Sequence, residues 1–266
     1  MVDRAGCGVE SQILDSQIPN AKMITIGDKE NVFILTGAGI SAESGIATFR
    51  DPNGVWQKWN PQKVATPEAW EADPKLVWSF YSERRRQMEG VRPNPAHYAL
   101  AGLETRLDGR LFVCTQNIDP LHEMAGSRRV IHMHGELMKS RCDRCSRPVF
   151  SDEQTYFDAV PRCPCGGQIR PHVCWFGEVP YDMDAVLDAL QSCSVFVTIG
   201  SSGTVEPAAS FALWAGRARK YYIGAEQPAN AMFFDEVFVG KAGELVPQLF
   251  SNTHPRDTET QRTFGI

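Results

Sequence analysis

The stretch that decides the fold of this chain is VFILTGAGISAESGIATFRD, residues 32–51. It begins with an apolar, β-branched run that predicts a buried strand. A Gly-x-Gly turn follows at Gly37 and Gly39, and the next residues are small. A strand that runs into a glycine turn and a helix start presents backbone N–H groups to a phosphate. The stretch therefore predicts the phosphate-binding turn of an α/β sheet, although a glycine turn alone is a weak signal.

The size and the charge of the chain exclude several classes of protein. With 266 residues it is long enough for one large domain and a small insert. A net charge of -5 and a pI near 5.7 argue against general binding to nucleic acids or anionic membranes. The sequence shows no membrane-length apolar run and no secretory signal. We therefore expect a monomeric, cytoplasmic protein with no nucleic-acid and no membrane partner.

Strand and helix signals alternate along the chain. Apolar runs predict further strands over residues 111–119, 130–135, 194–203 and 221–226. Capping residues before prolines predict helices that begin after Thr66, Asp73 and Asn94. Such alternation predicts an α/β fold with a mainly parallel sheet and helices on both faces. Ligands of these sheets bind at the carboxyl ends of the strands.

The segment after the first glycine turn does not fit a nicotinamide dehydrogenase. Such an enzyme completes a helix and then a second strand, which ends in an acidic residue about 20 residues further on. Around position 57 this chain has Trp56, Gln57 and Lys58 instead. The turn-forming residues 51–54 open a long loop, which predicts a cover over a bound ligand.

The eight cysteines indicate a metal site and not a disulfide framework. Two close pairs, Cys142-x-x-Cys145 and Cys163-x-Cys165, suit a tetrahedral Zn²⁺. The segment between the pairs has too few apolar residues to form its own core, so a metal would replace that core. Four thiolates leave no open position, which predicts a structural site. The alternative is two reduced thiol pairs without a metal.

Polar residues stand where two of the predicted strands end. His132 and His134 precede Gly135, and we assign His134 as the candidate general base and His132 a structural role. Asn117 and Asp119 end the neighbouring strand, where they form either a turn or contacts to the sugar and amide groups of a ligand.

The apolar segment RPHVCWFGEVP, residues 170–180, has two interpretations. Val173, Trp175 and Phe176 stand just before Gly177. They either pack in the interior or belong to an edge strand to which a peptide adds by β-augmentation.

Together these pieces resemble the sirtuin (Sir2) family of NAD-dependent protein deacylases, and most of all its bacterial type with a Tyr-x-x-Arg pair in the acyl pocket. The resemblance extends over about residues 31–250, and the matching motifs are GAGISAESGIATFRD (37–51), GVW (54–56), TQNID (115–119), HMHGEL (132–137), RPHVCWFGE (170–178), GSSGTVEPAA (200–209) and the four paired cysteines. It implies a large Rossmann-like domain and a small domain built from a helical insert and a zinc-binding module. The implied boundaries are 1–51, 92–138 and 181–266 for the large domain, 52–91 for the insert and 139–180 for the module.

The same resemblance implies the residues of the site. His134 and Asn117 would be catalytic, Zn²⁺ would be structural, and NAD⁺ would be a co-substrate that meets Gly37, Ala38, Gly39, Ser41, Ala42, Phe49, Arg50, Trp56, Gln116, Asn117, Ile118, Asp119, Gly200, Ser201, Ser202, Gly224, Ala225, Glu226 and Ala242. The partners would be acylated lysine side chains of proteins, held by Ala65, Tyr81, Arg84, Val173, Trp175, Phe176, Gly177 and Glu178.

The implied reaction breaks the bond between nicotinamide and ribose. The acyl oxygen attacks C1′ of the ribose, His134 then acts as the general base, and the products are nicotinamide, O-acyl-ADP-ribose and free lysine. Tyr81 and Arg84, with the small Ala65 beside them, imply a pocket for succinyl or malonyl groups. Composition alone instead favours a solvated run of arginines over residues 84–86.

Several departures from the family pattern are visible, among them Ser201 for the usual threonine and Glu206 for a more common aromatic or amide residue, and other interpretations stay open. Pro120 stands where the family has glycine, and Gly224-Ala225-Glu226 stands where it has Asn-x-Glu. One alternative is mono-ADP-ribosyl transfer or NAD hydrolysis, because the same bond is broken. Another is a zinc-ribbon interaction module on a degenerate NAD fold, for which the Gly224 departure is the only support.

Overall fold

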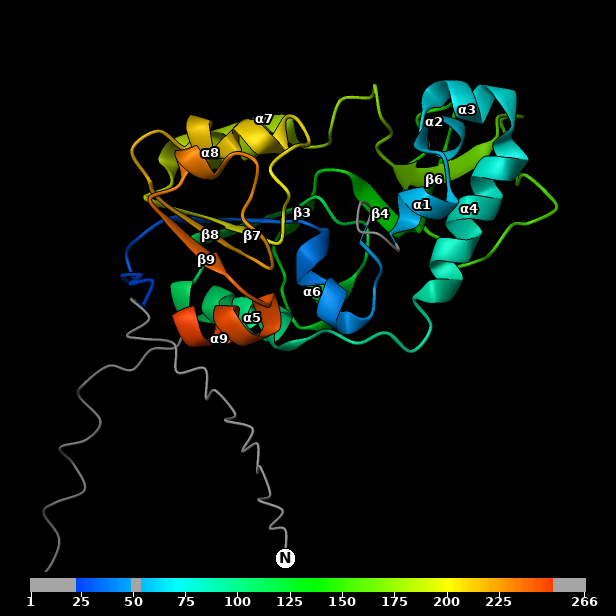
Figure 1. The fold of residues 1–266 in the computed structure, drawn as a ribbon. Helices are drawn as coiled ribbons and strands as arrows, with labels where there is room; N and C mark the ends of the chain where they lie inside the picture. The colour runs from blue at the N-terminus through cyan, green and yellow to red at the C-terminus, as the bar shows by residue number, and fades with distance from the viewer. Residues whose placement is uncertain (1–22, 49–53, 251–266) are drawn as a thin grey trace, which may run out of the picture.

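The computed structural model describes residues 23–48 and 54–250. Phe49, Arg50 and residues 51–53 of the predicted cover lie outside the described residues, so the predictions made for them are not tested. The described chain forms a large parallel sheet and, beside it, a smaller antiparallel one (Figure 1). Within that part of the chain no helix is long and apolar enough to cross a membrane.

The large sheet confirms the predicted α/β class. It has six strands in the order β3-β2-β1-β7-β8-β9, and every neighbouring pair is parallel. The strands are β1 (Val32–Thr36), β2 (Leu111–Thr115), β3 (Val130–His132), β7 (Val195–Ile199), β8 (Arg219–Gly224) and β9 (Glu236–Val239). Thr36 is in register with Thr115 of β2 and with Ile199 of β7, so the three central strands end at the same edge.

Helices cover both faces of the large sheet because alternate residues of each strand point to opposite faces. Val32 and Ile34 pack toward α5 (Pro95–Leu107) and α9 (Ala242–Phe250). Phe33 and Leu35 pack toward α7 (Met183–Ser192) and α8 (Phe211–Trp214). Figure 1 shows the two helix pairs on opposite sides of the strands. This double cover explains why β1 is apolar without interruption.

The smaller sheet and the first four helices share a second core. The sheet has the order β5-β4-β6, with β4 (Gly135–Cys142), β5 (Phe150–Ser151) and β6 (Ile169–Val173). The helices are α1 (Val55–Lys58), α2 (Pro61–Val64), α3 (Pro67–Ala72) and α4 (Pro74–Gln87). We call residues 55–87 and 135–178 the small module. Its core contains Trp70, Trp78 and Trp175, together with two of the paired cysteines.

The helix starts predicted from capping residues are confirmed. The side chain of Thr66 accepts from the Ala69 N–H at 3.1 Å, and that of Asp73 accepts from the Leu76 N–H at 3.0 Å. Asn94 caps α5 in the same way. Each such cap stabilises a helix by about 1 kcal/mol. The remaining short elements are α6 (Leu121–Met124) and the 3-10 turns Ala38–Ile40, Ala42–Ser44, Ala208–Ser210 and Ala231–Phe233.

One local prediction was wrong. The run 130–135 is not one strand, because β3 ends at His132 and Gly135, with φ 82°, begins β4. The alternative of a solvated arginine run holds for Arg86 alone, since Arg84 and Arg85 are buried. Arg85 donates to the Leu137 carbonyl at 2.9 Å and lies 3.4 Å from the Asp152 carboxylate. A buried guanidinium is tolerated because these partners replace its water.

Candidate active site

The glycine turns after β1 and β7 meet backbone to backbone. The Gly39 N–H donates to the Gly200 carbonyl at 2.8 Å. A Cβ atom at Gly37 would lie 2.8 Å from that same oxygen, and one at Gly39 would lie 2.8 Å from the Gly200 Cα. Gly200 itself has φ 65° and no room for a side chain against Ile40. Only glycine allows this approach, which leaves a side-chain-free surface for a ligand at the carboxyl edge of the sheet.

Asn117 follows β2 and is held on this surface. Its N–H donates to Thr115 Oγ1 at 3.0 Å, and its backbone carbonyl accepts from His132 Nδ1 at 3.0 Å. Its side-chain Nδ2 donates to the Gly37 carbonyl at 3.2 Å and to Ser41 Oγ at 3.1 Å. Because both amide hydrogens are used, the amide oxygen is the side-chain atom that can accept a hydrogen bond from a ligand hydroxyl.

His134, the predicted general base, lies in the turn between β3 and β4. Its Nδ1 lies 3.0 Å from the Gln116 carbonyl. A carbonyl only accepts, so Nδ1 carries the proton and Nε2 carries the lone pair. Burial lowers the pKa of His134, and the hydrogen bond to Gln116 opposes this only in part. The ring is therefore neutral at pH 7, as a general base requires.

Side-chain hydrogen bonds join the ends of β1, β2 and β7 into one network. Asp119 accepts from Ser41 Oγ at 3.0 Å and from the Leu121 N–H at 3.2 Å. Burial raises the pKa of Asp119 in spite of these donors. Gln116 Nε2 donates to Ser201 Oγ at 2.9 Å. The structure thus brings together predicted site residues that lie far apart in the sequence.

The other predicted cofactor residues lie around this edge or in the small module. Ala38, Ala42 and Ser202 belong to the glycine turns, and Ala242 begins α9. The Ile118 carbonyl accepts from Leu137 at 2.8 Å. Trp56 instead packs in the small module, where it stacks on Phe80 at 6.0 Å.

At the end of β8, Gly224 lies against the side chain of Tyr222. A Cβ atom at Gly224 would lie 2.4 Å from the hydroxyl of Tyr222, two residues earlier on the same strand. Ala225 and Glu226 follow and are exposed. Burial and the nearby Glu226 charge raise the pKa of Tyr222 to about 12, so its hydroxyl stays a donor. The sequence analysis did not single out Tyr222, because only the fold shows that its hydroxyl lies beside Gly224.

The residues predicted to hold an acyl group meet in the core of the small module. The Tyr81 hydroxyl accepts from Trp175 Nε1 at 3.0 Å, and Ala65 and Val173 are buried in the same cluster. Arg84 is 8% exposed and donates to Gln87 at 2.8 Å. Burial lowers the pKa of Arg84, and the charge of Asp119 acts in the opposite direction, which couples this arginine to the Asn117 side of the site.

Residues 175–178 form a turn after β6. The Phe176 N–H donates to the Ala65 carbonyl at 3.0 Å, and the Glu178 N–H to the Trp175 carbonyl at 2.9 Å. Glu178 also accepts from the Trp175 N–H at 2.8 Å. Phe176 is exposed and Gly177 has φ 92°. The contact to a peptide backbone that was predicted for these residues remains a prediction.

The four paired cysteines gather at one end of the smaller sheet. All four Sγ atoms lie within 4.8 Å of one another, with Cys142 and Cys165 at 3.6 Å and Cys145 and Cys163 at 3.8 Å. A tetrahedral Zn²⁺ with Zn–S bonds of about 2.3 Å requires sulfur–sulfur distances of about 3.8 Å. The donor set therefore fits a closed structural zinc site.

Comparison with known proteins agrees with this site. The family model described as the Sir2 family matches residues 37–207. The chain is 50% identical over 230 residues to an NAD-dependent protein deacylase of Caulobacter vibrioides, covering 81% of this chain and 93% of the relative. It is 48% identical to one of Shewanella oneidensis, covering 83% and 93%. The chain belongs to the Sir2 family.

Solved structures of the same family share the fold. A Sir2 homologue in complex with NAD has a TM-score of 0.76 and 38% identity, and the match covers 84% of this chain and 89% of that one. A Sir2 protein with a deacetylated peptide and 3′-O-acetyl ADP-ribose has a TM-score of 0.74 and 30% identity, with 82% and 91% covered.

Proposed function

We propose that this chain is an NAD-dependent protein-lysine deacylase. The observation that carries the proposal is that His134, a half-buried neutral imidazole with its lone pair on Nε2, and Asn117 both lie at the edge where the glycine turns of β1 and β7 meet. The names of the relatives and the bound molecules of the solved neighbours support it.

The side chains divide the chemistry between them. The glycine turns take the phosphates of NAD, and the Asn117 amide oxygen orients a ribose hydroxyl. The acyl oxygen of the substrate lysine attacks C1′ of that ribose as nicotinamide leaves. His134 Nε2 then accepts the proton of a ribose hydroxyl, so that the 2′-oxygen attacks the acyl carbon. Water completes the release of free lysine and O-acyl-ADP-ribose.

A zinc ion bound by Cys142, Cys145, Cys163 and Cys165 would hold the small module together. The backbone N–H groups of Arg144 and Gly167 lie 3.4 Å from the sulfurs of Cys142 and Cys165, respectively, as donors to thiolates do. With four sulfur ligands the ion would have a structural role and no open position.

The acyl preference is the finer part of the proposal. Arg84 and Tyr81 point from one turn of α4 into a buried region, and Arg84 offers a guanidinium to a succinyl or malonyl carboxylate. Ala65, a small residue, is buried in the same core as Tyr81. We propose that acidic acyl groups are removed in addition to acetyl groups.

The test uses acetyl-, succinyl- and malonyl-lysine peptides, each incubated with the full chain with and without NAD. Mass spectrometry follows the peptide, nicotinamide and O-acyl-ADP-ribose. NAD-dependent loss of the acyl group with stoichiometric O-acyl-ADP-ribose is expected. Nicotinamide release that does not depend on an acyl peptide would instead identify an NAD hydrolase and refute the deacylase proposal.

A further inference from the structure

His132, the last residue of β3, and His134, in the turn that follows it, hold successive carbonyls of the segment after β2. His134 Nδ1 contacts the Gln116 carbonyl, and His132 Nδ1 contacts the Asn117 carbonyl, each at 3.0 Å. For His132 a second acceptor is present, since its Nε2 lies 2.9 Å from the Glu123 carboxylate of α6. Carbonyls and carboxylates accept hydrogen bonds and do not donate them. Both ring nitrogens of His132 therefore carry protons, and the ring is an imidazolium.

The groups around His132 favour its positive charge. On α6, Glu123 contacts the ring, while burial and neighbouring histidines lower the pKa of His122 to about 3 and keep it neutral. Asp119 adds a carboxylate from the segment after β2, and Glu136 adds one from β4, where it pairs with Lys139 at 2.7 Å.

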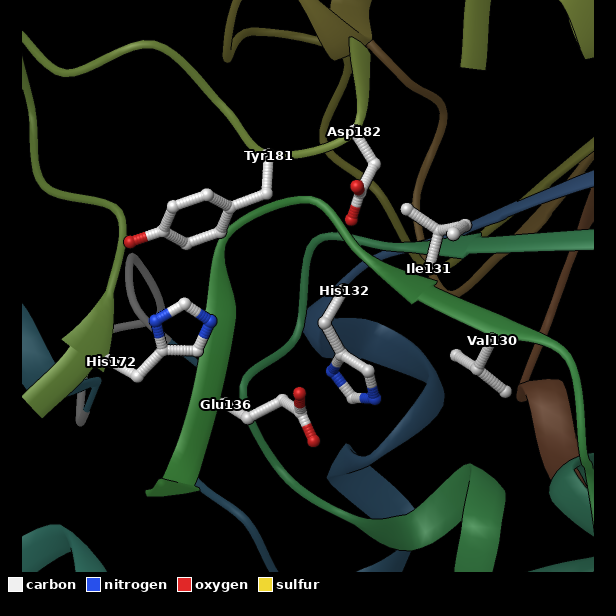
Figure 2. Close-up of a pocket in the computed structure, with 7 residues that line it drawn as sticks. All are labelled: Val130, Ile131, His132, Glu136, His172, Tyr181 and Asp182. Carbon is white, nitrogen blue, oxygen red and sulfur yellow. The ribbon is translucent and has the colours of Figure 1, made fainter. Parts of the chain in front are cut away.

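A cavity of about 310 Å³ borders the other side of the ring. Figure 2 shows His132 projecting into this region from the end of β3, with Glu136 facing it from β4. Asp182 adds a further carboxylate from the segment before α7, and His172 and Tyr181 stack on each other at 4.6 Å. Burial, and after it the charge of Arg141, lowers the pKa of His172, so this second histidine is neutral and does not repel His132.

The pKa values of His132 and His134 are consequently shifted in opposite directions. Burial by itself would lower the pKa of His132, but the hydrogen bond and charge of Glu123, with the charge of Glu136, raise it above its ordinary value. The pKa of Glu123 is lowered against the effect of its own burial, mainly by the hydrogen bond from His132. His134 lacks a carboxylate contact, and its pKa is lowered.

A neutral His132 could not serve both of its partners. It would have one proton for two acceptors, so either the Asn117 carbonyl or the Glu123 carboxylate would face a nitrogen lone pair. The Glu123 carboxylate is 43% exposed and carries a charge, so it competes strongly for the single proton. A ring that keeps its proton on Nε2 leaves the buried Asn117 carbonyl without a donor, which is costly, and the segment around Asn117 would shift to relieve it. That shift would move the Asn117 amide, whose two hydrogens fix it to Gly37 and Ser41.

We propose that His132 is a positioning residue for the reaction: its imidazolium, anchored by Glu123, fixes the backbone carbonyl of Asn117 and keeps the Asn117 amide aimed at the ribose of NAD. The inference rests on the proposed function, in which Asn117 orients that ribose. His132 acts through Asn117 and does not touch the reacting atoms.

A specific pH dependence follows from the two opposite requirements. His134 must be neutral, so kcat/KM for NAD falls as the pH drops through its lowered pKa. His132 must be charged, so kcat/KM falls again as the pH rises through its raised pKa. The plot of kcat/KM against pH is therefore bell-shaped. His134, the general base, sets its acid limb, and His132 sets its alkaline limb.

The experiment compares the pH profiles of the full wild-type chain and of Glu123→Gln, with an acetyl-lysine peptide at saturation. Removal of the contacting charge should move the alkaline limb down by about one pH unit and leave the acid limb in place. Glu136→Gln is the matched control, because Glu136 faces the ring without a hydrogen bond to it. The control should move the alkaline limb less.

A second variant and a direct measurement keep the test independent of folding. His132→Gln, with an unchanged circular dichroism spectrum, should lose the alkaline limb and raise the KM for NAD about five-fold or more. Nitrogen-15 NMR of the wild-type histidines should show both ring nitrogens of His132 protonated at pH 7. An unmoved alkaline limb in Glu123→Gln, or a singly protonated His132, would overturn the inference. Inactivity of the wild type on every peptide would refute the proposed function instead, while the NMR result would still decide the charge of His132.

Discussion

The large sheet and the small module hold their site residues in different ways. At the edge of the large sheet, Asn117, Asp119 and His134 are fixed by backbone groups of segments that directly follow buried strands or begin α6. In the small module, Tyr81 and Arg84 sit in a tryptophan-rich core beside a short sheet whose end carries the four cysteines. The large sheet can keep its geometry without a ligand, whereas the small module needs a metal to complete its core.

This difference separates two tasks. The groups that we propose for bond breaking are on the rigid sheet, and the groups that we propose for acyl selection are on the metal-supported module. The core of the small module shares no residue with the two cores of the large sheet. A substitution should therefore be able to impair acyl selection without impairing bond breaking, and the reverse.

Removal of zinc should have the largest effect. Structural zinc sites contribute on the order of 10 kcal/mol to the folding of small modules, so Cys142→Ser or a strong chelator should unfold the small module and abolish turnover. The large sheet keeps its own two cores, so NAD binding should persist in calorimetry. Metal analysis should find one zinc per wild-type chain.

Cys193→Ser is the matched control for zinc removal. Cys193 lies at the end of α7, far from the cluster in the fold, and its thiol donates to the Leu190 carbonyl. It should keep its zinc and its activity. Loss of NAD binding together with zinc would contradict the proposed independence of the two regions.

His134→Asn should have the next largest effect, and it acts on the large sheet alone. Loss of the general base should lower kcat by about 10²- to 10⁴-fold. Zinc content and the thermal unfolding temperature should change little, since His134 makes one backbone contact through its ring. Retention of more than a tenth of the wild-type kcat would exclude His134 as the base.

Arg84→Met should change selectivity and leave basic chemistry intact. A charge-assisted hydrogen bond is worth about 1.5–3 kcal/mol, so kcat/KM for a succinyl peptide should fall about ten- to hundred-fold. The acetyl peptide should be affected far less. Arg86→Met is the control, because Arg86 lies in the same run but is exposed. Equal losses on both peptides would indicate a structural role for Arg84.

Patterns of local origin were predictable from the sequence. The strand Val32–Thr36, the caps Thr66 and Asp73 and the paired cysteines all follow from neighbouring residues, and all are found as expected. Contacts across the fold were not predictable. Arg85 is apparently one of three equivalent surface arginines in the sequence, yet Asp152 and Leu137 receive it in the interior. Nothing near residue 85 in the chain indicates those partners.

The same limit applies to His132. The sequence assigns it a structural role next to the base, but its charge depends on Glu123 of α6, which only the fold brings to the ring. Gly224 is a second example, because the sequence marks it as a departure and only the fold shows which side chain lies beside it. The Tyr222 hydroxyl lies where a side chain at position 224 would begin.

Tyr222→Phe should have the smallest effect and should sharpen the comparison within the large sheet. The hydroxyl stands at the carboxyl end of β8, beside the strand that carries the Gly200 turn, so we expect it to bond the adenosine side of NAD. One hydrogen bond is worth about 0.5–1.5 kcal/mol, which predicts a rise in the KM for NAD of about two- to ten-fold at unchanged kcat. Tyr221→Phe makes the same change on the opposite face of β8, against α5 and α9, and should leave that KM unaltered. Equal KM values for the two variants would show that Tyr222 fills space at Gly224 without contacting NAD, and that this end of the sheet binds through its backbone alone.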